Sequence, residues 1–312
     1  MKLADRVSRI QPSPTLAITA KANALRAAGR DIIGFGAGEP DFDTPDNIKK
    51  AAIRAIEEGF TRYTPVGGID ELKDAIIDKL KRDNNLSYNR AQIAVSCGAK
   101  HTLSNLAQVL FEACDEVIIP APYWVSYPDI VLLADGTPVI LETREKDGFK
   151  VQPDDLRKAI TGRTKALIIN SPSNPTGAAY TLAELEALAD VIAETDIMVI
   201  SDDIYESIIY DGLPFHNICN AGEALHDRVI VVNGVSKTYA MTGWRIGYAA
   251  GPETIISAVS KIQSQNTSNP TSISQKASVE ALRGDQDSVQ RMVKEYWKRR
   301  DYIVDGLNEI NG

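Results

Sequence analysis

Short apolar runs alternate along this chain with longer stretches in which apolar and charged residues recur at helical spacing. Seven runs rich in valine and isoleucine predict strands, at residues 93–96, 116–120, 137–142, 165–170, 197–201, 228–232 and 246–250. The stretches around them predict helices at 46–58, 69–82, 99–112, 181–194, 252–264 and 271–283. Apolar strands joined by helices are typical of a sheet that is buried on both faces. The pattern therefore predicts an α/β fold with a mostly parallel sheet flanked by helices.

Two of the predicted helices carry candidate start signals. Thr181 is followed three residues later by Glu184, the spacing of a capping box. Asp46 stands at the beginning of 46–58 and is expected to cap that helix. A further helix is predicted near the end of the chain. Residues 285–310 form one long, charged stretch with helical periodicity.

Composition excludes several classes of function. The 312 residues are 44% hydrophobic, which is enough for a large core. The net charge is -8 and the charges are interspersed, so neither a nucleic-acid partner nor an anionic membrane is expected. The three cysteines and three histidines lack metal-ligand spacing, and no metal site is predicted. The opening MKLADRVSRIQPSP has no apolar run, so we expect no signal peptide and a cytoplasmic protein.

Polar or aromatic residues follow five of the predicted strands directly. They are CGAKHTL (97–103), APYW (121–124), SPSNPTG (171–177), DDIYE (202–206) and NGVSK (233–237). Ligands of open α/β sheets bind beyond the carboxyl ends of the strands. These five segments are therefore expected to meet at one ligand-binding edge.

One part of this edge has the chemistry of a phosphate site. Gly98, Ala99 and Lys100 open a predicted helix, where free N–H groups and the positive end of the helix dipole favour an anion. Ser236 could add a hydroxyl group and Arg245 a bidentate guanidinium. Neither GxxxxGK[ST] nor GxGxxG occurs, so the sequence does not indicate a nucleotide site.

The remaining groups suit a flat ring with an aldehyde. Asp202 could hold a cationic ring nitrogen, Tyr205 and Asn174 could bond a phenolate oxygen, and Trp124 could stack on the ring. Lys237 could form an imine with the aldehyde. A phosphate, a pyridinium, a phenolate and an aldehyde together describe pyridoxal 5′-phosphate.

The combination of motifs resembles the class I aminotransferases of fold type I. The motifs are GAGEPDFDTP (36–45), RYTPVGG (62–68), APYWVSYP (121–128), SPSNPTG, DDIYE and NGVSKTYAMTGWRIGY (233–248). Within that family the sequence is most similar to the bacterial aspartate aminotransferase branch, which includes aspartate/prephenate enzymes. The similarity extends from about Val7 to the last residue.

The resemblance implies a role for each residue of the predicted edge. Lys237 matches the lysine that bonds the cofactor aldehyde and moves the proton at the substrate α-carbon. Asp202 matches the partner of the ring nitrogen, Tyr205 and Asn174 match the partners of the ring hydroxyl, and Trp124 matches the stacking aromatic. Cofactor phosphate contacts are expected at Gly98, Ala99, Lys100, Ser236 and Arg245. Substrate contacts are expected at Gly38, Trp124, Asn174 and Lys100, the last for a distal carboxylate.

The family further implies a homodimer with a shared active site, because Tyr63 matches a tyrosine that reaches the neighbouring subunit's cofactor phosphate. The implied domains are an N-terminal arm with part of a small domain (1–44), a large cofactor-binding domain (45–284) and the start of a C-terminal small domain (285–312). Family members continue beyond this point and supply an arginine for the substrate α-carboxylate there. We therefore expect a chain with an incomplete small domain.

The implied activity is transfer of the amino group of L-aspartate to 2-oxoglutarate by a ping-pong mechanism, with prephenate or aromatic substrates as variants. Gln11 stands where prephenate-using relatives tend to carry a basic residue. A lyase on the same scaffold, or a catalytically impaired cofactor-binding fragment, would carry the same cofactor residues. Each residue alone also has an ordinary structural interpretation; Trp124 and Tyr127, for example, could be core aromatics.

Overall fold

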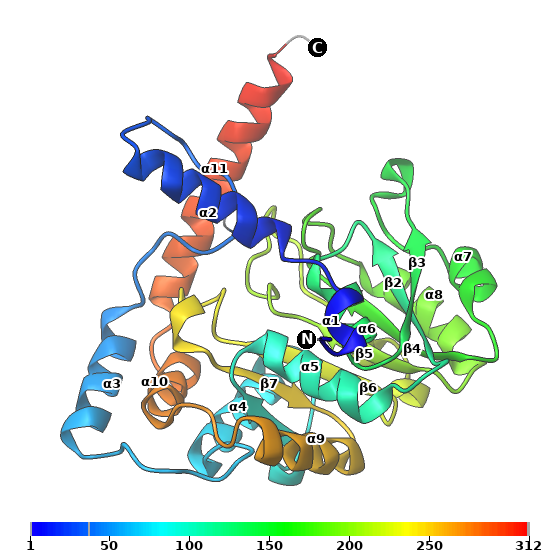
Figure 1. Cartoon of the computed structure of the whole chain (residues 1–312), viewed down its shortest axis with the longest axis horizontal. Helices are drawn as coiled ribbons and strands as arrows, with labels where there is room; N and C mark the ends of the chain where they lie inside the picture. The colour runs from blue at the N-terminus through cyan, green and yellow to red at the C-terminus, as the bar shows by residue number, and fades with distance from the viewer. Residues whose placement is uncertain (1, 37, 311–312) are drawn as a thin grey trace.

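The computed structural model describes residues 2–36 and 38–310, and a seven-stranded sheet lies at its centre (Figure 1). The strand order is β1-β7-β6-β5-β4-β2-β3. The strands are β1 (Ile93–Ser96), β2 (Glu116–Ala121), β3 (Thr137–Glu142), β4 (Thr164–Asn170), β5 (Met198–Asp202), β6 (Val229–Gly234) and β7 (Gly247–Ala250). Only β7 runs antiparallel to its neighbours, β1 and β6. The predicted mostly parallel sheet is confirmed.

Helices cover both faces of the sheet. One face packs against α5 (Ala99–Leu110), α6 (Ser126–Leu133) and α9 (Glu253–Asn266). The other packs against α4 (Asp70–Asn84), α7 (Pro153–Ala159), α8 (Leu182–Ala193) and α10 (Ser272–Arg283), with α3 (Asp46–Glu57) next to α10. Short 3-10 helices are η1 (Arg90–Gln92), η2 (Glu145–Asp147), η3 (Ile218–Ala221), η4 (Glu223–Leu225) and η5 (Thr242–Trp244). This layering places the carboxyl ends of the parallel strands at one edge.

The two predicted helix caps have different outcomes. The capping box of α8 is confirmed, because Thr181 and Glu184 exchange side-chain to backbone hydrogen bonds. The prediction that Asp46 caps α3 is wrong. Pro45 occupies the cap position, and Asp46 is the first helical residue, so its carboxylate lies past the cap and pairs with Lys49 at 2.9 Å.

The first residues lie near the helical layer of the sheet, where Arg9 pairs with Asp135 at 2.7 Å, whereas the last helix extends away from the sheet (Figure 1). The leading segment, which we define as residues 2–36, contains α1 (Asp5–Ser8) and α2 (Pro14–Ala27), and no residue of these two helices is buried. The long α11 (Asp287–Asn308) contacts the stretch that follows the leading segment: Phe42 and Tyr296 form an edge-to-face pair at 5.3 Å, and Arg299 binds Asp41 at 2.9 Å. Among helices in the described part of the chain, none is long and apolar enough to span a membrane.

Candidate active site

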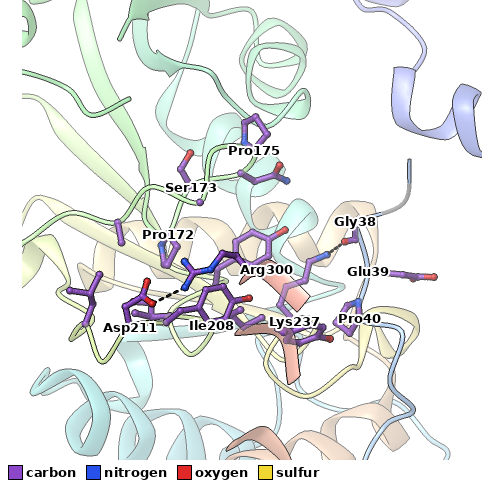
Figure 2. A pocket seen from close by; sticks show the side chains of 18 residues that line it. Gly38, Glu39, Pro40, Pro172, Ser173, Pro175, Ile208, Asp211, Lys237 and Arg300 are labelled. Atoms are coloured by element: carbon purple, nitrogen blue, oxygen red, sulfur yellow. Dashed lines mark hydrogen bonds and ion pairs between the residues drawn. The ribbon is translucent and has the colours of Figure 1, made fainter. Parts of the chain in front are cut away.

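A cavity of about 450 Å³ lies beyond the carboxyl ends of β4, β5 and β6. Four residues predicted for the site line it: Gly38, Asn174, Tyr205 and Lys237 (Figure 2). They come from the segment after residue 36, the loop after β4, the turn after β5 and the turn after β6. Four stretches that are distant in sequence therefore meet at one opening.

Lys237 is half-buried, and its amine reaches across the cavity to the segment after residue 36. Its Nζ donates a hydrogen bond to the carbonyl oxygen of Gly38 at 2.5 Å and lies 5.7 Å from the centre of the Tyr205 ring (Figure 2). Burial lowers the pKa of Lys237, and the nearby Arg245 lowers it further, while Glu39 opposes the change. A larger share of the amine is therefore neutral and nucleophilic near pH 7.

The segment that carries Gly38 is tied to the loop after Lys237 by two further bonds. Thr44 Oγ1 donates to the carbonyl of Ala240 at 2.7 Å, and Thr242 Oγ1 donates to a carboxylate oxygen of Glu39 at 3.0 Å. These contacts fix one wall of the cavity to the turn that presents the lysine.

Asp202 ends β5 as a buried carboxyl group, 3% exposed. The Tyr127 hydroxyl donates to Asp202 Oδ2 at 2.7 Å, and the Ile204 amide donates to Oδ1. Burial raises the pKa of Asp202 to about 6, against the lowering effect of the Tyr127 hydrogen bond. A buried carboxylate with so few donors favours a cationic partner in its vicinity.

The loop after β4 is fixed to the end of β5 by Asn170. Its Nδ2 donates to the Asp202 carbonyl at 2.8 Å, and its Oδ1 accepts from the Asn174 amide at 2.8 Å. Asn174 faces Tyr205, whose pKa is raised to about 12 by burial and by Asp202, with Asn174 acting in the opposite direction. Asn170 therefore aligns the asparagine and the tyrosine that the sequence predicts to act together.

The start of α5 forms a narrow cradle next to Arg245. Gly98 is the N-cap of α5 at φ 92°, and a Cβ there would lie 2.3 Å from Arg245 Nη2. A Cβ at Gly247 would lie 2.2 Å from the backbone nitrogen of Ala99. Both positions require glycine so that the guanidinium and a neighbouring strand can approach the helix start. The first N–H groups of a helix have no partner within it, so the cradle suits an anion.

The remaining predicted residues differ in burial and in contacts. Ser236 is buried directly before Lys237, and Lys100 Nζ lies 4.9 Å from the centre of the Trp124 ring. Burial lowers the pKa of Lys100, and Arg245 contributes in the same direction. Tyr63 is 91% exposed and is absent from the described residues that line the cavity.

Sequence interpretation missed three residues that shape the site. The sequence indicates only a core aromatic at Tyr127, although Tyr127 lies three residues after Trp124, the spacing that puts two side chains on one helical turn. Asn170 precedes the loop of residues 171–177, and its two backbone contacts have no sequence signal. Gly247 could have been found only from its close approach to Ala99, which depends on the fold.

Comparison with known proteins gives the same assignment as the motifs. The family model for aminotransferases of class I and II matches residues 30–312. The chain is 55% identical to the aspartate/prephenate aminotransferase of Nitrosomonas europaea, covering 100% of this chain and 79% of that protein. The aspartate aminotransferase structure from Rhizobium meliloti matches with a TM-score of 0.97 at 47% identity, covering 100% of this chain and 78% of the other. The Thermus thermophilus aspartate aminotransferase with maleate matches with a TM-score of 0.93 at 44% identity, covering 99% and 80%. The chain belongs to the class I and II aminotransferases.

Proposed function

We propose that this aminotransferase uses pyridoxal 5′-phosphate to move the amino group of L-aspartate to 2-oxoglutarate. The observation that carries the proposal is the meeting of Lys237, Asp202 and the Gly98 cradle at one edge of the sheet. The similarity to relatives named aspartate or aspartate/prephenate aminotransferase also supports the proposal.

The donor set fits this cofactor. The cradle at Gly98, Ala99 and Lys100, with Ser236 and Arg245, would hold the phosphate. Asp202 would hold the ring nitrogen, Asn174 and Tyr205 the ring hydroxyl, and Trp124 the ring face. When bound, the cofactor supplies an aldehyde and an electron-withdrawing ring that stabilises negative charge at the substrate α-carbon.

Lys237 would do the work of nucleophile and base. The pKa of its amine is lowered by burial, so a neutral amine is available to bond an aldehyde and afterwards to take a proton from the substrate α-carbon. Asp202, which burial and Tyr127 hold in place, would keep the ring nitrogen protonated through its negative charge.

Lys100 is the proposed contact for a distal carboxylate, with Gly38, Asn174 and Trp124 as the other substrate contacts. Maleate, the molecule in the Thermus thermophilus structure, is a four-carbon dicarboxylate like aspartate. We expect Lys100→Ala to lower kcat/KM for aspartate by about 10-fold, with less change for an aromatic amino acid, because one charge-assisted contact is lost. An unchanged preference between the two donors would remove Lys100 from the specificity site.

We further infer a homodimer in which Tyr63 of one subunit serves the active site of the other. The exposure of Tyr63, and of apolar side chains in the leading segment, supports this arrangement. In the proposed division, residues 45–284 form the cofactor-binding domain and residues 1–44 and 285–312 contribute to a small domain. A cytoplasmic location is part of the same proposal.

The test is the visible absorption spectrum of the protein loaded with pyridoxal 5′-phosphate, before and after addition of L-aspartate. We expect the band of the lysine-bound cofactor to convert to that of pyridoxamine 5′-phosphate, and 2-oxoglutarate to restore the first band. A stable initial band that aspartate does not change would contradict transamination of aspartate, and the absence of any bound-cofactor band would contradict the cofactor assignment.

A further inference from the structure

A buried polar cluster lies next to the proposed site, and none of its members lines the cavity. It consists of Lys79 and Asn84 on α4, Glu206 after β5 and Asn233 on β6. Lys79 is 4% exposed and Glu206 is 9% exposed. The proposed chemistry uses none of these four residues, so their burial needs another explanation.

Glu206 is the centre of the cluster. Its Oε1 pairs with Lys79 Nζ and accepts a hydrogen bond from Asn233 Nδ2 at 2.8 Å, and its Oε2 accepts from Asn84 Nδ2 at 2.7 Å. Lys79 also donates to Asn84 Oδ1 at 2.7 Å. Both carboxylate oxygens are therefore bonded. Because apolar residues of similar size often stabilise an interior at least as well as a buried ion pair does, stability alone is a weak reason for this arrangement.

The cluster connects the two segments that carry the proposed catalytic groups. Glu206 directly follows Tyr205 and lies four residues after Asp202, while Asn233 lies four residues before Lys237. The paired register of β5 and β6 ends at Asp202 and Val232. The bond from Asn233 to Glu206 thus joins the two segments beyond the point where the sheet's own pairing stops.

Asn233 also holds its own strand end, because its Oδ1 accepts a hydrogen bond from the Gly234 amide at 2.7 Å. Gly234 pairs with Gly247 on β7, the glycine that lets the start of α5 approach. One asparagine side chain therefore links Glu206 to the strand end from which Ser236 and Lys237 follow.

We propose that Glu206, held by Lys79 and Asn84, is a positioning residue that fixes the Asp202 to Tyr205 turn relative to Lys237 through Asn233. The inference rests on the proposed function. A displacement of about 1 Å between reacting groups can cost on the order of 100-fold in rate, so such a tie has a measurable consequence.

The first test is Glu206→Gln in the holoenzyme. Glutamine keeps the size of the side chain, but its amide nitrogen would face the Lys79, Asn84 or Asn233 donor and cannot accept from it. We expect kcat to fall by about 10-fold or more with KM within about 3-fold, because binding groups stay and alignment changes. We also expect the pH midpoint of the bound-cofactor absorption to move by about half a pH unit or more, since the lysine, the tyrosine and the aspartate change their relative positions.

A second variant keeps the test valid if Glu206→Gln folds poorly. Asn233→Ala preserves the ion pair of Lys79 and Glu206 and removes the tie to β6, together with the bond that Asn233 accepts from the Gly234 amide. It should therefore shift the same spectral midpoint and lower kcat. Asn220→Ala is the matched control, because the Asn220 amide donates to the Asn84 carbonyl at 2.7 Å on the outer side of the cluster. It should lower Tm without moving the midpoint.

If Glu206→Gln and Asn233→Ala lower only Tm, with the kcat and spectral midpoint of the wild type, the cluster is structural and the inference is overturned. The same holds if Asn220→Ala moves the midpoint as far as Asn233→Ala. Failure of the proposed function looks different, because the unmodified protein would then form no cofactor band or would not convert it with aspartate.

Discussion

The sheet edge around Lys237 and the leading segment (residues 2–36) differ in what holds them. At the edge, Asp202 and Ser236 are buried within the chain, Asp202 accepts a hydrogen bond from Tyr127, and β5 pairs with β6 behind them. In the leading segment, α1 and α2 bury no residue, and Leu16, Ile18, Ile33 and Phe35 are 57–85% exposed. The edge is specified by contacts within one copy of the chain. The leading segment presents apolar surface of the kind that marks an interface, which matches the proposed homodimer.

Replacement of Lys237 should cause the largest loss of activity among changes at the sheet edge. Lys237→Ala removes the only side chain assigned as nucleophile and base, and we expect the aspartate half-reaction to slow by about 1,000-fold or more. Single-turnover absorption measures the rate, and thermal unfolding should change little because the residue is only half-buried. Lys237→Arg, which keeps the charge but not a neutral amine, should fail equally. Turnover at the wild-type rate in either variant would remove Lys237 from the chemistry.

Replacement of Asp202 should separate activity from stability. Asp202→Asn keeps the shape and can still accept from Tyr127, but it loses the charge that would hold the ring nitrogen, so we expect kcat to fall by about 100-fold to 1,000-fold. In the cofactor-free chain, the same replacement should raise the free energy of unfolding at neutral pH. The pKa of Asp202 is raised to about 6 when folded, from 3.8, so its contribution to stability is present below about pH 4 and is lost as the pH rises through 6.

Asp202→Asn should therefore gain stability relative to wild type between pH 4 and pH 7, on the order of 1–3 kcal/mol. Urea denaturation of both cofactor-free proteins at the two pH values measures this difference. If the difference in free energy of unfolding between Asp202→Asn and the wild type were the same at pH 4 and pH 7, the folded-state pKa of Asp202 would not be raised by burial.

The leading segment is tested by placing a charge on its single aromatic residue, Phe35. Phe35 is 85% exposed in the single chain, so Phe35→Asp should leave the stability of one subunit almost unchanged. If Phe35 is buried against a second copy, dimer dissociation should increase by about 10-fold or more. Ile53→Asp on α3, which is 52% exposed, is the control. Sedimentation at several protein concentrations compares the self-association of the two variants with that of the wild type. Equal self-association of all three proteins would contradict a role for Phe35 in the dimer.

The same contrast explains what the sequence could predict. All seven strands, and the helices from α3 to α11 except α6 and α7, lie within two residues of their predicted bounds. Each of these elements buries apolar residues within this chain, and that burial appears in the sequence as an apolar periodicity from which the element can be predicted. The apolar pattern does not predict α1 and α2, because no residue of either helix is buried and apolar residues of α2, such as Leu16 and Ile18, are exposed in the single chain.

The candidate site divides in a similar manner. Lys237, Asp202, Asn174 and Tyr205 lie at or just after strand ends, so the rule that ligands bind beyond strand ends is enough to bring them together. Tyr127 and Gly247 act through contacts with residues distant in sequence, and Glu206 resembles any surface glutamate until Lys79 is placed beside it. Partners of this kind follow from the packing of α4 and α6 against the sheet, which no local pattern specifies.

The smallest predicted effect compares one threonine from each region. Thr181 caps α8, which packs on the sheet, so Thr181→Ala should lower the free energy of unfolding by about 1 kcal/mol without changing kcat. Thr19 of α2 donates to the Thr15 carbonyl one turn earlier, its one side-chain bond among the described residues. Thr19→Ala should leave the global unfolding of the monomer almost unchanged, because no residue of α2 is buried in the single chain and alanine is the better helix former. Urea denaturation below the dimer dissociation constant measures both. If Thr19→Ala destabilised the monomer as much as Thr181→Ala, the leading segment would fold together with the sheet, and the proposed dependence of that segment on a second subunit would lose its physical basis.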